Sequence, residues 1–376
     1  MTSRLDAPAA TQPTSAAPGR PSSRVPWLLV GCVVLVASVV LALVIGPASV
    51  VGPEPITPAQ VLQSAWHHLL AWLAELGLPV TVPENSLSPI RDAIIWQGRA
   101  PRALTAVLVG AGLALCGVVL QAVTRNPLAD PYLLGISSGA SLGAVAVLVL
   151  GVAVPLPVAA FAGALVALLA TLALAGVGGR MTATRAVLAG VAVGQACGAG
   201  VSFVIFSTTR GDSYRDILGW LMGTFGAAEW SSVAIAGTAL VVLGGLLLAY
   251  GRTLDAFAFG DVAATALGID VVRTRWLLLV ISALLTGALV SVSGAIGFVG
   301  LTVPHVVRLL LGPTRAGNAA VARTSAVVGA IFLLWADTVA RTVFAPLEVP
   351  VGVLTALLGA PVFAILLMRG RRRGEA

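Results

Sequence analysis

The feature that most constrains the fold is a run of 22 uncharged residues between Arg102 and Arg125. At 1.5 Å of rise per residue, a helix of that length crosses the roughly 30 Å hydrocarbon core of a membrane. The turn NPLADP (126–131) follows, and its prolines cannot continue a helix in lipid. The next apolar run opens with a glycine at every fourth position from Gly135 to Gly143, which lets two helix backbones approach closely. The segment therefore predicts two membrane-crossing helices joined by a tight turn.

The composition excludes a soluble globular domain. Hydrophobic residues make up 58% of the chain and charged residues 10%, and the mean hydropathy is +1.00; about a quarter of the residues of a soluble domain are charged. All 22 basic residues are arginine. Since the phosphate-binding loop GxxxxGK[ST] requires a lysine, this ATPase site cannot be built here. Any ATP that drives transport must be hydrolysed by another polypeptide.

Residues suited to catalysis or metal binding are few and scattered. The three cysteines, Cys32, Cys116 and Cys197, each stand alone in an apolar stretch without CxxC spacing. His67 and His68 are adjacent and diverge in direction on a predicted helix, and His305 is distant, so no HExxH-type metal site exists. We expect no catalytic residue, no metal site and no cofactor.

Ten apolar runs predict an all-α, polytopic membrane protein. They lie near residues 27–45, 103–122, 133–152, 157–177, 186–206, 231–250, 276–296, 297–311, 324–343 and 350–368. Hydropathy alone merges the seventh run with the eighth, across Gly294, Gly297 and Gly300.

The regions outside the spans have distinct compositions. Residues 1–26 are rich in Pro, Ala, Ser and Thr and predict a disordered tail, residues 27–369 form the membrane domain, and residues 370–376 are a basic tail. The amphipathic stretch Pro58 to Leu76 is expected on the outer surface or packed over the bundle.

The arginines predict the orientation. With the amino terminus inside, sixteen of the 22 arginines lie on the cytoplasmic side, and an even number of spans returns the RGRRR segment to that side. We expect a multi-pass protein of the bacterial plasma membrane with both termini in the cytoplasm.

Several separated motifs carry a family resemblance. R-x-P-R at 99–102, the apolar span, Q-x-x-x-x-NPLADP at 121–131 and LLGISSGA at 133–140 resemble the permease subunits of ABC importers for iron chelates, haem and cobalamin, the FecCD or BtuC-like permeases. The resemblance runs from about Trp96 to Arg369. It implies a type II permease fold with ten helices, and it places the break between the seventh and eighth spans.

Arginines on the outer face run against the tendency of basic residues to lie on the cytoplasmic side, so their presence there requires an explanation. Arg99 and Arg102, at positions i and i+3 beside Pro101, share one helix face and form a cationic pair. The resemblance implies that this pair and Arg341 receive acidic side chains of an extracytoplasmic substrate-binding protein. From spacing alone the alternative is favoured, in which these arginines reach toward lipid headgroups.

Residues 251–275 form a long polar segment between the sixth and seventh spans. Asp261 is expected to N-cap, and Gly268 to C-cap, a two-turn helix of small residues. The pattern G-D-x-x-A-x-x-L-G resembles the coupling loop that fits a groove on the ATPase subunit, and the alternative is a solvated connector. The residues assigned to coupling are Gly260, Asp261, Ala264, Leu267 and Gly268.

The turn after the second span resembles the inner gate of this family. The residues that the resemblance assigns to the gate are Asn126, Leu128 and, opposite them, Thr184 in the segment that opens the fifth span. The alternative is that NPLADP only ends one helix and starts the next. A further stripe on the fifth span, Gly190, Gly194 and Gly198, is interpreted as a helix-packing surface.

Asp337 lies in the middle of the ninth span. A carboxylate at the bilayer centre costs about 2.5 to 3.5 kcal/mol on insertion scales, so Asp337 must face protein or water. Arg341, four residues later, is the expected partner for a salt bridge. A substrate or docking contact of Asp337 is the alternative.

The resemblance favours one functional class. It implies a permease of an ATP-driven importer with a separate ATPase, a binding protein, a second permease copy or a similar permease, surrounding lipid and no nucleic acid. An ion-coupled secondary transporter would need more intramembrane carboxylates than Asp337 alone. The cargo expected first is a ferric siderophore, with haem or cobalamin as alternatives. A contact of His67 and His68 with haem is a weaker interpretation of that pair than an exposed position at the membrane interface.

Overall fold

The computed structural model describes residues 25–45, 56–177, 182–208, 214–312, 317–345 and 347–374, and within these ranges the regular structure is helical throughout. Helix α1 (Val25–Val44) includes the last two residues of the predicted amino-terminal tail. Helix α17 (Val351–Gly374) continues through residues expected in the basic carboxyl-terminal tail. The rest of the tail predictions, residues 1–24 and 375–376, lies outside the described residues.

The described helices match the ten predicted spans one for one. Six are long and apolar enough to cross a membrane: Pro89–Thr124, Leu156–Gly176, Thr184–Ser207, Trp230–Ala249, Val271–Ser293 and Asn318–Thr342. Four shorter apolar helices correspond to the other predicted runs: Leu28–Val44, Ile136–Leu150, Val299–Leu311 and Val351–Ile365.

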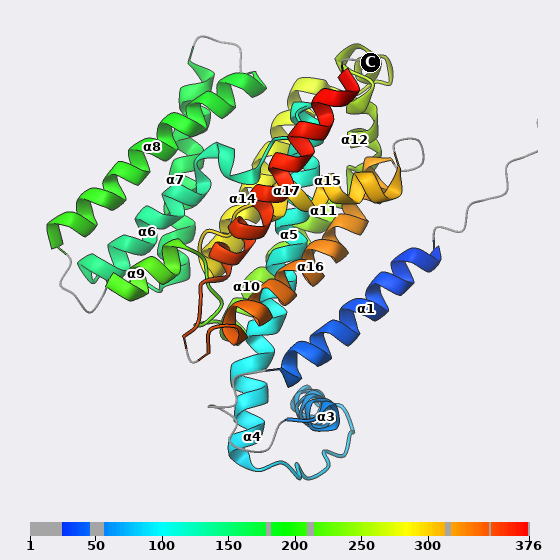
Figure 1. Cartoon of the computed structure of the whole chain (residues 1–376), viewed down its shortest axis with the longest axis vertical. Coiled ribbons are helices and arrows are strands. Elements are labelled where there is room, and N and C mark those ends of the chain that lie inside the picture. Colours follow the sequence, from blue (N-terminus) through cyan, green and yellow to red (C-terminus); the bar gives the residue numbers. More distant parts are fainter. Residues whose placement is uncertain are drawn as a thin grey trace, which may run out of the picture.

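The longest of these spans is built from three segments. Helix α4 (Pro89–Ala93) leads through one turn of π-helix, η1 (Ile94–Arg99), into α5 (Ala100–Thr124). Helix α5 lies at the centre of the molecule and contacts α14 (Val271–Ser293), α15 (Val299–Leu311) and α16 (Asn318–Thr342) (Figure 1).

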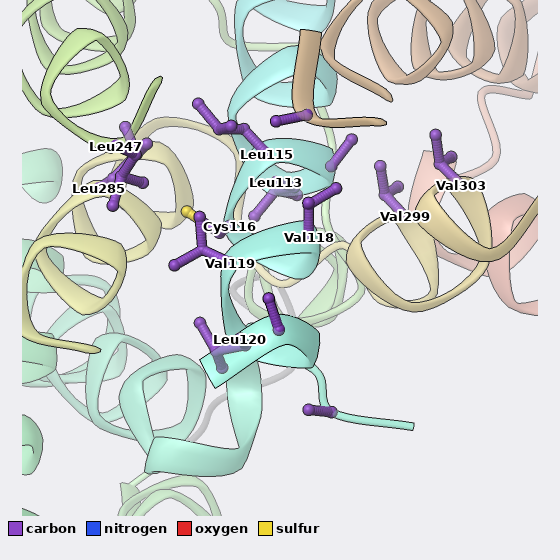
Figure 2. Close-up of a cluster of buried hydrophobic side chains, with 14 of the residues drawn as sticks. Leu113, Leu115, Cys116, Val118, Val119, Leu120, Leu247, Leu285, Val299 and Val303 are labelled. Atoms are coloured by element: carbon purple, nitrogen blue, oxygen red, sulfur yellow. The ribbon is translucent and has the colours of Figure 1, made fainter. Parts of the chain in front are cut away.

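The main hydrophobic core surrounds α5. Figure 2 shows Leu113, Cys116 and Val119 of α5 among side chains that include Leu285 of α14 and Val299 of α15. The Cys116 thiol is fully buried in this core and donates to the carbonyl oxygen of Ser282 at 3.5 Å.

Helices α6 (Ile136–Leu150), α7 (Leu156–Gly176), α8 (Ala183–Thr208) and the short α9 (Tyr214–Leu221) form a second group on one side of α5 (Figure 1). Small residues bring α6 and α7 together, because a Cβ on Gly139 would meet the backbone oxygen of Gly163 at 2.5 Å. The close approach predicted from the glycine stripe is therefore present.

The predicted break between the seventh and eighth spans is also present. Helix α14 ends at Ser293 and α15 begins at Val299. Gly294 has a φ of 68°, and a Cβ there would lie 2.1 Å from the backbone oxygen of Trp220, so only glycine fits this turn.

The remaining elements lie near the ends of the bundle. Helix α3 (Pro58–Glu75) lies beside α4 at one end of the bundle, here called the α4 end. At the other end, called the α13 end, the sixth span (α10, Trp230–Ala239; η4, Leu240–Gly244; α11, Gly245–Ala249) leads into α12 (Gly251–Ala258) and α13 (Asp261–Ala266). The turn after α5 contains the short 3-10 helix η2 (Pro131–Leu134).

Candidate functional site

At the α4 end, Arg102 binds two carboxylates that are distant in sequence. Its Nε and Nη2 atoms donate to the two carboxylate oxygens of Asp337 at 2.9 and 3.0 Å, and its Nη1 donates to Glu348 at 2.7 Å. The Asp337 side chain is 4% exposed, whereas that of Glu348 is 47% exposed. The planar guanidinium suits this two-pronged contact with a carboxylate. The arginine thus neutralises the carboxylate that would otherwise be costly in the span.

The predicted pair between Asp337 and Arg341 is wrong. Arg341 instead points toward α1, where its Nη2 donates to the carbonyl oxygen of Ala42 at 2.6 Å. Helix α16 packs on both α1 and α5, so neighbours on two faces of α16 decide the partners of Asp337 and Arg341. Four-residue spacing along one helix permits an ion pair but does not require it.

Arg99 also reaches α1. Its Nη1 donates to the carbonyl oxygens of Leu43 and Val44 at 2.8 and 2.9 Å, and the residue is only 7% exposed. The last carbonyls of a helix have no partner within the helix and carry partial negative charge, so a cation there is favourable. Together Arg99 and Arg341 cap the carboxyl end of α1. Of the three predicted docking arginines, Arg102 alone forms ion pairs with acidic side chains. One of these, Glu348, is exposed.

At the α13 end, the predicted coupling helix forms. Gly260, with a φ of 97°, is the N-cap, so the prediction of Asp261 as N-cap is wrong by one residue. Gly268, with a φ of 79°, follows the C-cap Leu267 in the left-handed conformation that ends many helices.

The Asp261 carboxylate joins this helix to two spans. Its Oδ1 forms an ion pair with the Nη2 of Arg125 at 3.0 Å, at the end of α5, and accepts a hydrogen bond from Arg275 at 2.8 Å, in α14. Neither Arg125 nor Arg275 was predicted as a site residue, because sequence spacing alone gives no signal for either contact.

The outer face of α13 is apolar. Val262 is 86% exposed and Leu267 is 70% exposed, and Phe259, just before the helix, is 80% exposed. Ala264 is fully buried and faces the bundle instead. Among the predicted coupling residues, Leu267 is therefore exposed, whereas Ala264 packs inside the chain.

The predicted gate residues lie near the same end. Asn126 is exposed and Leu128 is 42% exposed; the Asn126 Oδ1 accepts from the Leu128 N–H at 2.9 Å and shapes the turn. Thr184 is exposed in the first turn of α8. Where α8 meets the segment after this turn, a Cβ on Gly190 would lie 2.1 Å from the backbone oxygen of Leu133.

Only part of the glycine stripe on α8 packs against other segments of this chain. Gly190 touches backbone, and a Cβ on Gly194 would lie 3.5 Å from the hydroxyl of Ser138, as expected for a packing surface. A Cβ on Gly198 would meet open space, so the stripe packs against this chain only near its amino-terminal end.

The turn also contains a partly buried acid, Asp130. The Asp130 Oδ1 accepts from the N–H of Tyr132 at 2.8 Å, and burial raises the pKa of Asp130 to about 6. The Tyr132 hydroxyl donates to the carbonyl oxygen of Ile296 at 2.9 Å and so ties the turn to the break before α15.

Both adjacent histidines have partners within the chain. The His67 Nδ1 lies 2.9 Å from the carbonyl oxygen of Pro83, and the His68 Nε2 lies 2.8 Å from the Asp92 carboxylate. His68 also stacks on Trp96, with ring centroids 4.2 Å apart. Within the described ranges, no three His, Cys, Asp or Glu side chains gather as a metal site would require.

Comparison with known proteins defines the class. The FecCD transport family model matches residues 39–369. The chain is 43% identical to the cobalamin import system permease protein BtuC of Halobacterium salinarum, over 76% of this chain and 75% of that protein. It is 40% identical to the hemin transport system permease protein HmuU of Yersinia pestis, over 74% of this chain and 84% of that protein.

A solved structure agrees. An inward-facing metal-chelate type ABC transporter aligns with a TM-score of 0.74 at 30% identity, covering 92% of this chain and 99% of that one. The fold and these matches define a membrane-embedded permease subunit of an ABC importer. The chain belongs to the FecCD transport family.

Proposed function

We propose that this permease imports a bulky metal chelate together with three partners: an ATPase at the α13 end, a binding protein at the α4 end, and a second permease copy. The observation that carries the proposal is the difference between the two ends. An apolar, exposed surface on α13 suits a protein groove, and Arg102 with its carboxylates lies at the opposite end. The α13 end is then cytoplasmic, as the arginine distribution predicts.

The cargo we propose first is a tetrapyrrole chelate. Two relatives with named cargo carry cobalamin and hemin. A ferric siderophore, the first expectation from the sequence, is the second candidate, and the similarity to a metal-chelate type transporter supports it. Both classes are large, so each fits a pathway between two copies better than a pore within one chain.

The second copy is proposed to lie along α8. This helix is the least buried of the six long spans, and its Gln195 and Ser202 are exposed polar residues within an apolar helix. Polar groups in a span are costly against lipid, whereas a partner helix or a water-filled pathway accommodates them.

Docking of the binding protein is proposed to centre on Arg102. Arg99 and Arg341 donate to carbonyl oxygens of α1, so they act by fixing α1 and the shape of this face. Charge reversal at Arg102 is expected to weaken docking more at low salt than at high salt, because salt screens the attraction between this end of the permease and an acidic partner.

The experiment that tests the cargo uses the substrate-binding protein that docks on this permease. That protein is titrated with cyanocobalamin, haemin and ferric ferrioxamine B, and each cargo that binds is offered to vesicles that contain the assembled transporter. Uptake of cyanocobalamin or haemin supports the first candidate. Uptake of the ferric siderophore alone moves the assignment to the second.

A further inference from the structure

Helix α3 exposes a continuous apolar stripe at the α4 end. Five large side chains repeat at intervals of three or four residues, which places them along one side of the helix. Their exposed fractions are Leu62 57%, Trp66 58%, Leu69 44%, Trp72 56% and Leu76 60%. Single exposed apolar residues are ordinary, but a run of this kind marks an interaction surface.

Hydrogen bonds on the other sides of α3 determine the direction in which the stripe faces. The Ser64 hydroxyl donates to Asp92 at 2.6 Å and His68 contacts the same carboxylate at 2.8 Å, so one side of α3 is held against α4. A further side carries Gln63 and His67, which bond to Ser86 and to the carbonyl oxygen of Pro83 in the following loop. The stripe therefore faces neither α4 nor this loop.

The orientation of α3 suits a membrane surface. Figure 1 shows α3 nearly end-on, beside the end of α1, whereas α1 and α5 are seen along their lengths. A helix that lies crosswise to the spans lies roughly in the plane of the membrane. Within α3 the one charged residue is Glu75, in the last turn, so the stripe offers no charge to a protein partner.

A cavity borders the same side. It has a volume of about 500 Å³ and is lined mainly by Leu69, Trp72, Trp96 and Trp230, with His68 and Glu75 among its polar residues. Leu69 and Trp72 belong to both the stripe and the cavity wall. Tryptophan is enriched where proteins meet the membrane interface, because its ring is apolar and its N–H is polar.

We propose that α3 is an interfacial helix whose stripe inserts into the lipid leaflet at the α4 end, and that a phospholipid acyl chain fills the cavity beside it. An amphipathic helix of this kind lies about 5 to 10 Å into the boundary between headgroups and acyl chains. Through Ser64, His68 and Asp92, the inserted helix holds α4 at a set height above the membrane. This inference does not depend on the cargo or on the docking role of Arg102.

The test compares two labelled positions on α3. In a background with Cys32, Cys116 and Cys197 replaced by alanine, Leu69→Cys reports on the stripe. Ala74→Cys, on the side of Gln63 and His67, is the matched control. Each is labelled with the fluorophore NBD in vesicles of phosphatidylcholine and phosphatidylglycerol, and quenching by doxyl-labelled lipid is compared with quenching by aqueous iodide.

The proposal expects lipid quenching of the label at position 69, at a depth of about 5 to 10 Å, and iodide quenching at position 74. Iodide quenching at both positions would overturn it and would leave a protein as the occupant of the stripe. Wild-type cysteines are kept in a second measurement, in which brominated lipid quenches tryptophan emission. Trp66→Phe with Trp72→Phe is expected to remove a large share of that quenching, and an unchanged share would contradict the proposal.

Discussion

Replacing Arg102 by methionine tests the arrangement at the α4 end. The change keeps an apolar stem of similar length and removes the guanidinium that forms the ion pair with Asp337. Because the Asp337 side chain is 4% exposed, the variant leaves a buried carboxylate without its cation. Breaking a buried pair in this way costs about 3 to 5 kcal/mol of unfolding free energy.

The contact with Glu348 contributes little to this value. Its side chain is 47% exposed, and exposed ion pairs contribute about 0 to 1 kcal/mol. Glu348→Gln is therefore the matched control and is expected to unfold close to the wild type. The double variant Arg102→Met with Asp337→Leu is expected to recover most of the lost stability, since removing both members of a buried pair is often nearly neutral.

The assay is unfolding of the purified permease by sodium dodecyl sulfate in mixed micelles, followed by far-ultraviolet circular dichroism. The four variants of the Arg102 and Asp337 cycle give the coupling energy of the pair. Unfolding of Arg102→Met at the wild-type midpoint would contradict a stabilising role of this pair. A stronger coupling of Asp337 to Arg341 than to Arg102 would contradict it as well.

Three further predictions follow from single contacts. Gly117→Ala is expected to lower the unfolding free energy of the permease by about 1 to 3 kcal/mol in the same titration, because the added Cβ would lie 1.9 Å from the Gly300 oxygen. Gly245→Ala is the control, since its Cβ would meet open space and should not destabilise the permease. Asp261→Asn is expected to lower transport per ATP hydrolysed while the ATPase still binds, and adding Arg125→Gln should cause little further loss if the two act as a pair. Folding raises the pKa of Asp130 from 3.8 to about 6. The contribution of this carboxyl to stability is therefore full below pH 3.8 and is lost as the pH rises through about 6. Asp130→Asn should flatten this part of the dependence of unfolding free energy on pH.

Local features of the sequence predicted much of the fold. Long apolar runs identify spans because a backbone in lipid must satisfy its own hydrogen bonds, and a helix does so within one segment. The break at Gly294 was placed by the family resemblance, because hydropathy alone merges the seventh and eighth runs. The end of the helix at Gly268 was predicted locally, because a glycine tolerates positive φ, although the C-cap itself is Leu267. These features depend on residues close together in the chain.

The site depended on contacts between distant segments, which a single sequence does not show. Asp337 pairs with Arg102, 235 positions away, rather than with Arg341 on its own helix. Asp261 likewise meets Arg125 and Arg275 because α13 folds back against the ends of two spans. Helix spacing identified which residues share a face, but only the packing of α16 between α1 and α5 decided what each face meets.

The central claim is that this permease moves its cargo only with energy and cargo supplied by other proteins. The most direct measurement is uptake of radiolabelled cyanocobalamin, haemin or ferric siderophore into vesicles that contain the permease alone, or the permease with its ATPase and binding protein. The account predicts uptake only in the complete system with ATP, and none under an imposed proton or sodium gradient alone. Uptake by the permease alone, driven by such a gradient, would contradict it.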